Sequence, residues 1–290
     1  IKRSNISLDQ MIEMSKGKES KESYESGSFS ELILCLPGGT KEAHFKSIGE
    51  LIDAGMGMVR SHQFIMLPGA EASNPETRKQ FNLQTQFRVI PLTVSQYELF
   101  GEVFSAPEID EICVSSSTMS YDDYLECRLM DLTTEIFYNN GVFKEFFNFL
   151  KINGVLISEL IFAIHSKVRE KNNPLESLYE GFLKDTKELW NTSGEVREFL
   201  NQPGVLDRYQ NGELGKNEQL MYRGLAMFKH MEGLHAIVFQ QTEKLLVEKL
   251  GHDDQKMNYL KELVEFSLMR KKDVLAIDKC PQKLFHFDFI

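Results

Sequence analysis

Two short apolar segments, each ended by a Pro-Gly pair, constrain the fold of this chain more than any other feature. The first runs from Phe29 to Leu36 (FSELILCL), and the second runs from Met58 to Leu67 (MVRSHQFIML). Both read as buried strands, because they are short, rich in apolar residues and stopped by turn residues. The residues between them recur at helical spacing, with Thr40 as N-cap, apolar positions Phe45, Ile48, Leu51 and Ile52, and an Ala54-Gly55 end. A strand–helix–strand unit with such short connections predicts two parallel strands.

The rest of the chain divides into further candidate strands and a long helical part. Gln84–Pro91 and Ile109–Val114 are candidate strands, and Ser120 with Asp123 forms a capping-box pattern that opens a helix. Helical patterns dominate from there on, including one long helix predicted over about Asn217–Leu250, while the last residues, Lys283–Ile290, alternate like a strand. We therefore expect an α/β unit over residues 1–135, followed by a mainly α-helical domain over residues 136–290.

Charge and composition exclude several classes of partner. The chain has 290 residues and a net charge of −10, so a nucleic-acid backbone would be repelled, and we expect no nucleic-acid partner. No stretch approaches the roughly 20 apolar residues that span a bilayer, and the polar start is no signal peptide. The four cysteines, at 35, 113, 127 and 280, have neither disulfide-like nor metal-like spacing, which favours a reducing cytoplasm. Since the first residue is Ile rather than Met, we also expect the chain to be part of a longer polypeptide.

The segment Ser30 to Thr40 (SELILCLPGGT) carries the strongest functional signal. Glu31 stands at the head of a buried strand, and burying a bare carboxylate costs several kcal/mol, so it needs a partner or a ligand. The Pro-Gly-Gly-Thr turn that follows lets backbone approach a ligand at the C-terminal edge of the strand, where α/β folds place their sites. The alternative is structural, with a tight strand-to-helix turn and Glu31 at a solvated strand start.

These residues resemble a motif of radical S-adenosylmethionine (SAM) enzymes. Glu31 to Thr40 is similar to the strand "D/E-L-I-x-G-L-P-G-E-T" of that superfamily, and Ser61 to Glu71 (SHQFIMLPGAE) looks like its following barrel strand. The segments Thr85–Pro91 and Ser117–Asp123 resemble parts of the cobalamin-binding branch. The resemblance covers roughly residues 1–135. It implies the C-terminal part of a partial (β/α) barrel that binds SAM.

The resemblance also implies roles for individual residues. It places Glu31 on the ribose hydroxyls of SAM, Arg3 on the SAM carboxylate, and the backbone edge of Gln63, Phe64, Ile65 and Met66 against the adenine, with Ile65 nearest. A carboxylate on two hydroxyls and a guanidinium on a carboxylate are both sound pairings. Structural readings stay open beside these roles, since Arg3 can be simply solvated and Ile65 can be core packing.

Two departures and one absence set limits to the resemblance. Cys35 stands where the family pattern has Gly, and Gly39 stands where it has Glu. A radical SAM cluster also needs three cysteines in a C-x3-C-x2-C run, and the cysteines of this chain are too widely separated to supply it. We therefore expect the [4Fe-4S] cluster and any cobalamin to belong to a missing N-terminal half of the same polypeptide.

Two hypotheses about function follow from these observations. In the first, the chain is the C-terminal fragment of a radical SAM enzyme that acts on an unknown small organic molecule, and it is inactive by itself. In the second, it is a non-catalytic α/β-plus-helical binding or scaffold protein, and the Leu-Pro-Gly turn is structural.

Overall fold

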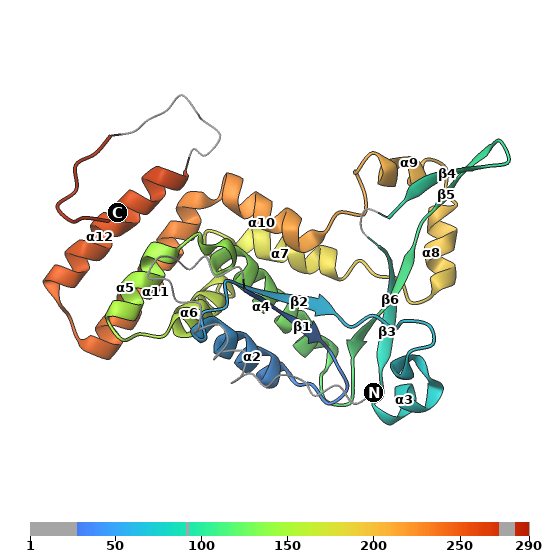
Figure 1. The fold of residues 1–290 in the computed structure, drawn as a ribbon, viewed down its shortest axis with the longest axis horizontal. Helices are drawn as coiled ribbons and strands as arrows, with labels where there is room; N and C mark the ends of the chain where they lie inside the picture. Colours follow the sequence, from blue (N-terminus) through green and yellow to red (C-terminus); the bar gives the residue numbers. More distant parts are fainter. Residues whose placement is uncertain (1–27, 91–92, 273–281, 290) are drawn as a thin grey trace.

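A computed structural model describes residues 28–90, 93–272 and 282–289 of the chain (Figure 1). The strands are β1 (Phe29–Leu34), β2 (Met58–Gln63), β3 (Gln84–Val89), β4 (Ser95–Leu99), β5 (Glu102–Ala106) and β6 (Ile109–Ser115). The longer helices are α2 (Lys41–Asp53), α4 (Tyr121–Phe137), α5 (Lys144–Ile152), α6 (Ile157–Val168), α7 (Glu176–Thr186), α8 (Ser193–Leu200), α10 (Glu218–Lys229), α11 (Met231–Leu250) and α12 (Asp254–Lys271). Short helical segments are η1 (Glu71–Ser73), α3 (Pro75–Gln80), η2 (Asn139–Gly141) and α9 (Val205–Gln210).

The predicted strand–helix–strand unit is present as β1–α2–β2, and its two strands are parallel, with Glu31 opposite Arg60 and Ile33 opposite His62. Thr40 caps α2, because its hydroxyl accepts from the Ala43 N–H at 3.1 Å. The prediction for the second strand was too long, since pairing with β1 ends at Gln63. The chain then continues beside β6, where Phe64 to Met66 run antiparallel to that strand. The segment 58–67 therefore pairs with β1 in its first part and with β6 in its second part.

The remaining strands are antiparallel, and this part of the fold differs from a barrel of parallel strands. The predicted strands at 84–91 and 109–114 exist as β3 and β6, but they pair antiparallel with each other. The described strands form three two-stranded sheets and no barrel, and only β1 and β2 pair in parallel. The architecture is therefore mixed α/β, as predicted, while the partial barrel is not seen as such in the described ranges.

The β4–β5 hairpin was not predicted, and it projects away from the body of the molecule (Figure 1). Its turn places Phe100 and Gly101 at positive φ, 55° and 80°, as a two-residue hairpin turn of the primed type requires. Such turns are usually predicted from Asn-Gly or Asp-Gly, and the Phe-Gly pair of this chain does not match that pattern.

Helix α4 lies at the centre of the core. One apolar cluster joins Ile48 and Ile52 of α2 and Val59 of β2 to residues of α4, α5, α6, α7, α11 and α12. The domain boundary predicted at residue 135 falls inside α4, where Glu135 and Ile136 are both buried. The α/β unit and the helices that follow it therefore share one core.

Two predicted elements of the helical part were wrong. The single helix over Asn217–Leu250 is two helices, because His230 has φ −126° and ψ 19° and separates α10 from α11. The break lets α10 pack on α4 and α7 while α11 packs on α6 and α12. Residues 282–289 form no strand; Phe285 and Phe289 pack instead against Phe266 of α12. Within the described ranges, no helix has both the length and the apolar character needed to cross a bilayer.

Candidate functional site

The β1–β2 sheet has one covered face and one open face. Ser30 and Leu34 of β1 and Val59 and Ser61 of β2 are buried on the side of α2 and α4. The residues between them form what we call the open face: Phe29, Glu31, Ile33, Arg60 and His62, all of them exposed. Phe29 is 63% exposed and Ile33 49%, which is unusual for large apolar residues of a parallel strand pair.

Glu31 lies on this open face and is half-exposed rather than buried. Its Oε1 atom lies 3.1 Å from Nε2 of His62, and the two side chains are 54% and 56% exposed. An exposed pair of this kind adds little to stability. The fold therefore does not depend on the carboxylate, which remains accessible to a ligand, and its setting equally suits the solvated strand position considered as the alternative.

Gln63 points to the opposite face from Glu31, because it lies in the alternating row of Val59 and Ser61. Its Nε2 donates to the hydroxyl of Tyr124 at 2.5 Å, and its Oε1 accepts from the guanidinium of Arg88. The structure therefore does not bring the side chains of Glu31 and Gln63 together.

Phe64, Ile65 and Met66 place their backbone between two sheets. The Phe64 carbonyl accepts from the Cys113 N–H, and the Met66 N–H donates to the Glu111 carbonyl, both at 2.8 Å. Alternate residues of an antiparallel ladder direct their amides to opposite sides, so the Ile65 N–H points away from β6. Phe64 and Ile65 are half-buried and Met66 is buried, all three against the apolar cluster beneath β6. Arg3 lies outside the described residues.

The two edges of the β1–β2 sheet are also unequal. The side-chain amide of Asn139 closes the β2 edge: its Oδ1 accepts from the Val59 N–H and its Nδ2 donates to the Val59 carbonyl, both at 2.9 Å. A strand therefore cannot add there. The outer edge of β1 pairs with no strand of the described ranges.

The segment that joins β1 to α2 contains two departures from the radical SAM pattern, Cys35 and Gly39. Cys35, which replaces the glycine of that pattern, has φ 69°, a left-handed conformation that favours glycine. Gly39 accepts a hydrogen bond on its carbonyl from Thr118 at 2.7 Å, so the turn contacts a second segment that resembles the family.

The three cysteines within the described ranges are buried and do not form a cluster-binding loop. Cys35, Cys113 and Cys127 are all buried, and the sulfur atoms of Cys35 and Cys113 lie 3.6 Å apart. The contact with Cys113, together with burial, raises the pKa of the Cys35 thiol, which disfavours the thiolate needed for metal binding. No group of three or more His, Cys, Asp or Glu side chains in the described part of the chain is arranged to hold a metal ion.

The structure also assembles polar groups that no motif indicated. Nε2 of His44 lies 2.8 Å from Oδ1 of Asp131 and 3.5 Å from Oγ of Ser61, inside the core. Because one ring nitrogen makes both contacts, this is not a Ser-His-Asp relay, which uses the two ring nitrogens separately. The three residues come from β2, α2 and α4, and no spacing in the sequence indicates such a contact.

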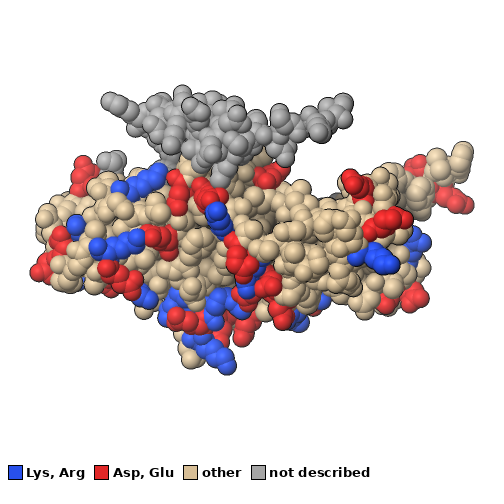
Figure 2. All heavy atoms as spheres, turned by 90° about the horizontal axis from the view of Figure 1, so that it is seen from below, with Lys and Arg blue, Asp and Glu red and all other residues tan. Residues whose placement is uncertain are grey.

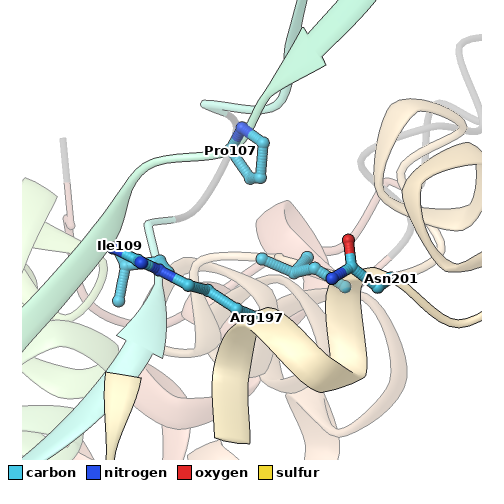
Figure 3. A pocket seen from close by; sticks show the side chains of 5 residues that line it. Pro107, Ile109, Arg197 and Asn201 are labelled. Atoms are coloured by element: carbon cyan, nitrogen blue, oxygen red, sulfur yellow. The ribbon is translucent and has the colours of Figure 1, made fainter. Parts of the chain in front are cut away.

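A surface hollow of about 460 Å³ lies between the start of β6 and α8 (Figure 3). Pro107 and Ile109 line it on one side, and Arg197, Leu200 and Asn201 line it from α8. It is remote in the fold from the open face, and none of its residues was predicted as a site. Acidic and basic side chains are interspersed over the face of the molecule seen in Figure 2, without a large patch of either sign.

No family model matches the chain, and no curated protein is detectably similar to it.

Proposed function

We propose that this chain is the SAM-binding, C-terminal part of a cobalamin-type radical SAM barrel that acts in the cytoplasm on a small organic molecule. The observation that supports this best is the one-sided β1–α2–β2 unit. Helices cover one face of its parallel strands, and the other face exposes Glu31 between Phe29 and Ile33.

An open face with apolar residues is what part of a barrel would present. In a β/α barrel the helices pack outside, and alternate residues of each strand point into the interior. Enclosing a Phe or Ile side chain contributes roughly 1.5–3 kcal/mol. Strands added at the outer edge of β1, which pairs with none of the described strands, would enclose Phe29 and Ile33, whereas Asn139 blocks growth beyond β2. This asymmetry suits the last strands of a barrel.

Glu31 would bind the ribose of SAM on this face. Its two carboxylate oxygens are accessible and can accept from two adjacent hydroxyls, while His62 orients them from the neighbouring strand. The Ile65 amide, directed away from β6, is the backbone group of the 63–66 segment best placed for the adenine. The resemblance assigns the SAM carboxylate to Arg3.

The conformation of Cys35 supports the resemblance from another direction. The family pattern has a glycine where this chain has Cys35, and φ at that residue is 69°. A glycine adopts this backbone without strain. The turn therefore has the geometry for which the pattern's glycine is suited, although the residue itself has changed.

The cysteines of the described ranges do not fit an iron–sulfur cluster, so we assign no step of radical chemistry to them. The [4Fe-4S] cluster and cobalamin would be held by an N-terminal half of the same polypeptide. A direct consequence is that the purified chain should be colourless. A brown protein with stoichiometric iron would contradict this assignment of the cysteines.

The second candidate is a non-catalytic binding or scaffold protein. The half-exposed Glu31–His62 pair favours it, because that pair suits a solvated strand without any ligand.

Titration with SAM, followed by amide NMR shifts, separates the two candidates. We expect millimolar SAM to shift the amides of Glu31, Ile33 and Ile65, because a half site binds weakly but locally. Glu31→Gln should abolish these shifts, while Glu42→Gln, an equal charge change on an exposed residue of α2, should leave them unchanged. Shifts that survive Glu31→Gln, or that are absent from the open face, would favour the scaffold protein.

A further inference from the structure

A polar network of two buried and two half-buried side chains lies on the other side of β2 from Glu31, between the β3–β6 pair and α4. Arg88 donates to Gln63, and Gln63 in turn donates to the hydroxyl of Tyr124 at 2.5 Å. Arg128 follows Tyr124 by four residues on α4, which places both on the same side of the helix. We call Gln63, Arg88, Tyr124 and Arg128 the Arg88–Arg128 cluster.

Hydrogen-bond donors in this cluster exceed the acceptors. The Nε atoms of Arg88 and Arg128 are buried and have no hydrogen-bond partner among the described residues. The Tyr124 oxygen already accepts from Gln63, so its own O–H is left to donate. Buried donors are nearly always satisfied in native proteins, so the two unsatisfied Nε atoms require an explanation.

The two positive charges of the cluster are also weakly compensated. Nη2 of Arg88 lies 3.5 Å from Asp110, and burial raises the pKa of that carboxyl in spite of Arg88 beside it. Arg128, with its side chain only 5% exposed, lies 4.0 Å from Glu218, too far for a hydrogen bond. Its guanidinium lies over the ring of Phe182, 5.4 Å from the centroid. Arg128 therefore has no hydrogen-bonded counter-charge, and a buried charge in that state is strongly destabilising.

We propose that the Arg88–Arg128 cluster binds an anionic small molecule through a phosphate or carboxylate group, held by the two guanidiniums and the Tyr124 hydroxyl. Such a group supplies acceptor oxygens and negative charge together, and the planar fork of arginine suits both kinds of oxyanion. The site lies on the helix-covered side of β2, so it is separate from the open face. It rests on its own contacts, independently of the proposed SAM binding.

Titration of the full chain with sodium phosphate and with sodium acetate tests the proposal, at constant ionic strength made up with chloride. We expect a saturable rise in melting temperature with at least one of the two anions, and the tighter one identifies the group. Arg88→Gln should weaken its binding about tenfold or more, since it removes charge-assisted hydrogen bonds. Arg208→Gln removes the same charge from an exposed residue on α9 and should leave the affinity unchanged.

Crystals soaked in sodium tungstate give a second measurement that does not depend on the stability of a variant. We expect a tungstate peak between Arg88 and Arg128. Ordered water alone at that position, no saturable effect of either anion, or equal affinity in Arg88→Gln and the unmodified chain would overturn the proposal.

Discussion

Helix α4 and the open face of β1–β2 differ in how deeply their residues are buried. Every residue of α4 from Leu129 to Phe137 is buried, and some of its polar groups bond to other elements, for example Thr133 to His165 and Tyr179. On the open face, Phe29 and Ile33 are exposed beside a half-exposed ion pair. The first region is a completed interior. The second has the composition of an interior on one side only, and this contrast motivates the proposal of a partial barrel.

The largest effect should come from comparing two phenylalanines, one packed against α4 and one on the open face. Phe143→Ala removes a fully buried ring that stacks on Phe137, and we expect a loss of about 3–5 kcal/mol in the free energy of unfolding, measured in urea. Phe29→Ala, on the open face, should cost less than about 1 kcal/mol. Equal losses would show that the open face is covered in the folded chain, and the contrast would then fail.

An intermediate effect should appear in the pH dependence of stability. Burial lowers the pKa of His235 to about 4, and its ring bonds to the Met231 carbonyl and to Ser267. A lowered pKa means that the unfolded chain binds a proton that the folded chain does not. The His235 contribution is therefore present above pH 6.5 and is lost as the pH falls toward 4, by about 3 kcal/mol at most.

Urea denaturation between pH 7 and pH 4 measures this dependence. We expect His235→Gln to show a shallower loss of stability on acidification than the unmodified chain. His62→Gln, on the open face, is the matched control and should keep the steeper loss. A parallel pH profile for His235→Gln would mean that this ring does not control the acid response of the helical core.

The smallest expected effect is a difference in stability between glycine and alanine at Cys35, the residue that follows β1, and at Cys127 in α4. Because φ is 69° there, Cys35→Gly should be more stable than Cys35→Ala, by about 1 kcal/mol. Cys127, buried within α4, should show the reverse order, since glycine costs about 1 kcal/mol relative to alanine inside a helix. Thermal unfolding of the four variants measures both differences. If the glycine and alanine variants had the same order of stability at both positions, the positive φ of Cys35 would no longer support the resemblance to a family pattern that has glycine there.

Local signals explain which elements could be predicted. Thr40 and Ser120 cap their helices as expected, because a cap depends on residues within one turn. The break at His230, the end of β2 at Gln63 and the antiparallel pairing of β3 with β6 were missed. Each of these features depends on how segments that are distant in the sequence pack, so no local residue pattern predicts it.

The candidate site also combines features that could be predicted from the sequence with features that could not. The motif around Glu31 was visible in the sequence, but its half-exposed setting and its partner His62 come from the pairing of two strands. The Arg88–Arg128 cluster had no sequence signal at all, since its members come from three separate elements.

From the amino-acid sequence alone, the β1–α2–β2 order, the parallel pairing of β1 with β2 and the turn after β1 could be predicted, because short connections and capping residues act over a few positions. The three-dimensional packing was needed to show which face of that sheet is open. It was also needed to show that Glu31 and Gln63 point apart, and that the Nε atoms of Arg88 and Arg128 are buried without a hydrogen-bond partner among the described residues. Burial and charge compensation are set through space by residues far apart in the chain, so they follow from the packing of the whole fold.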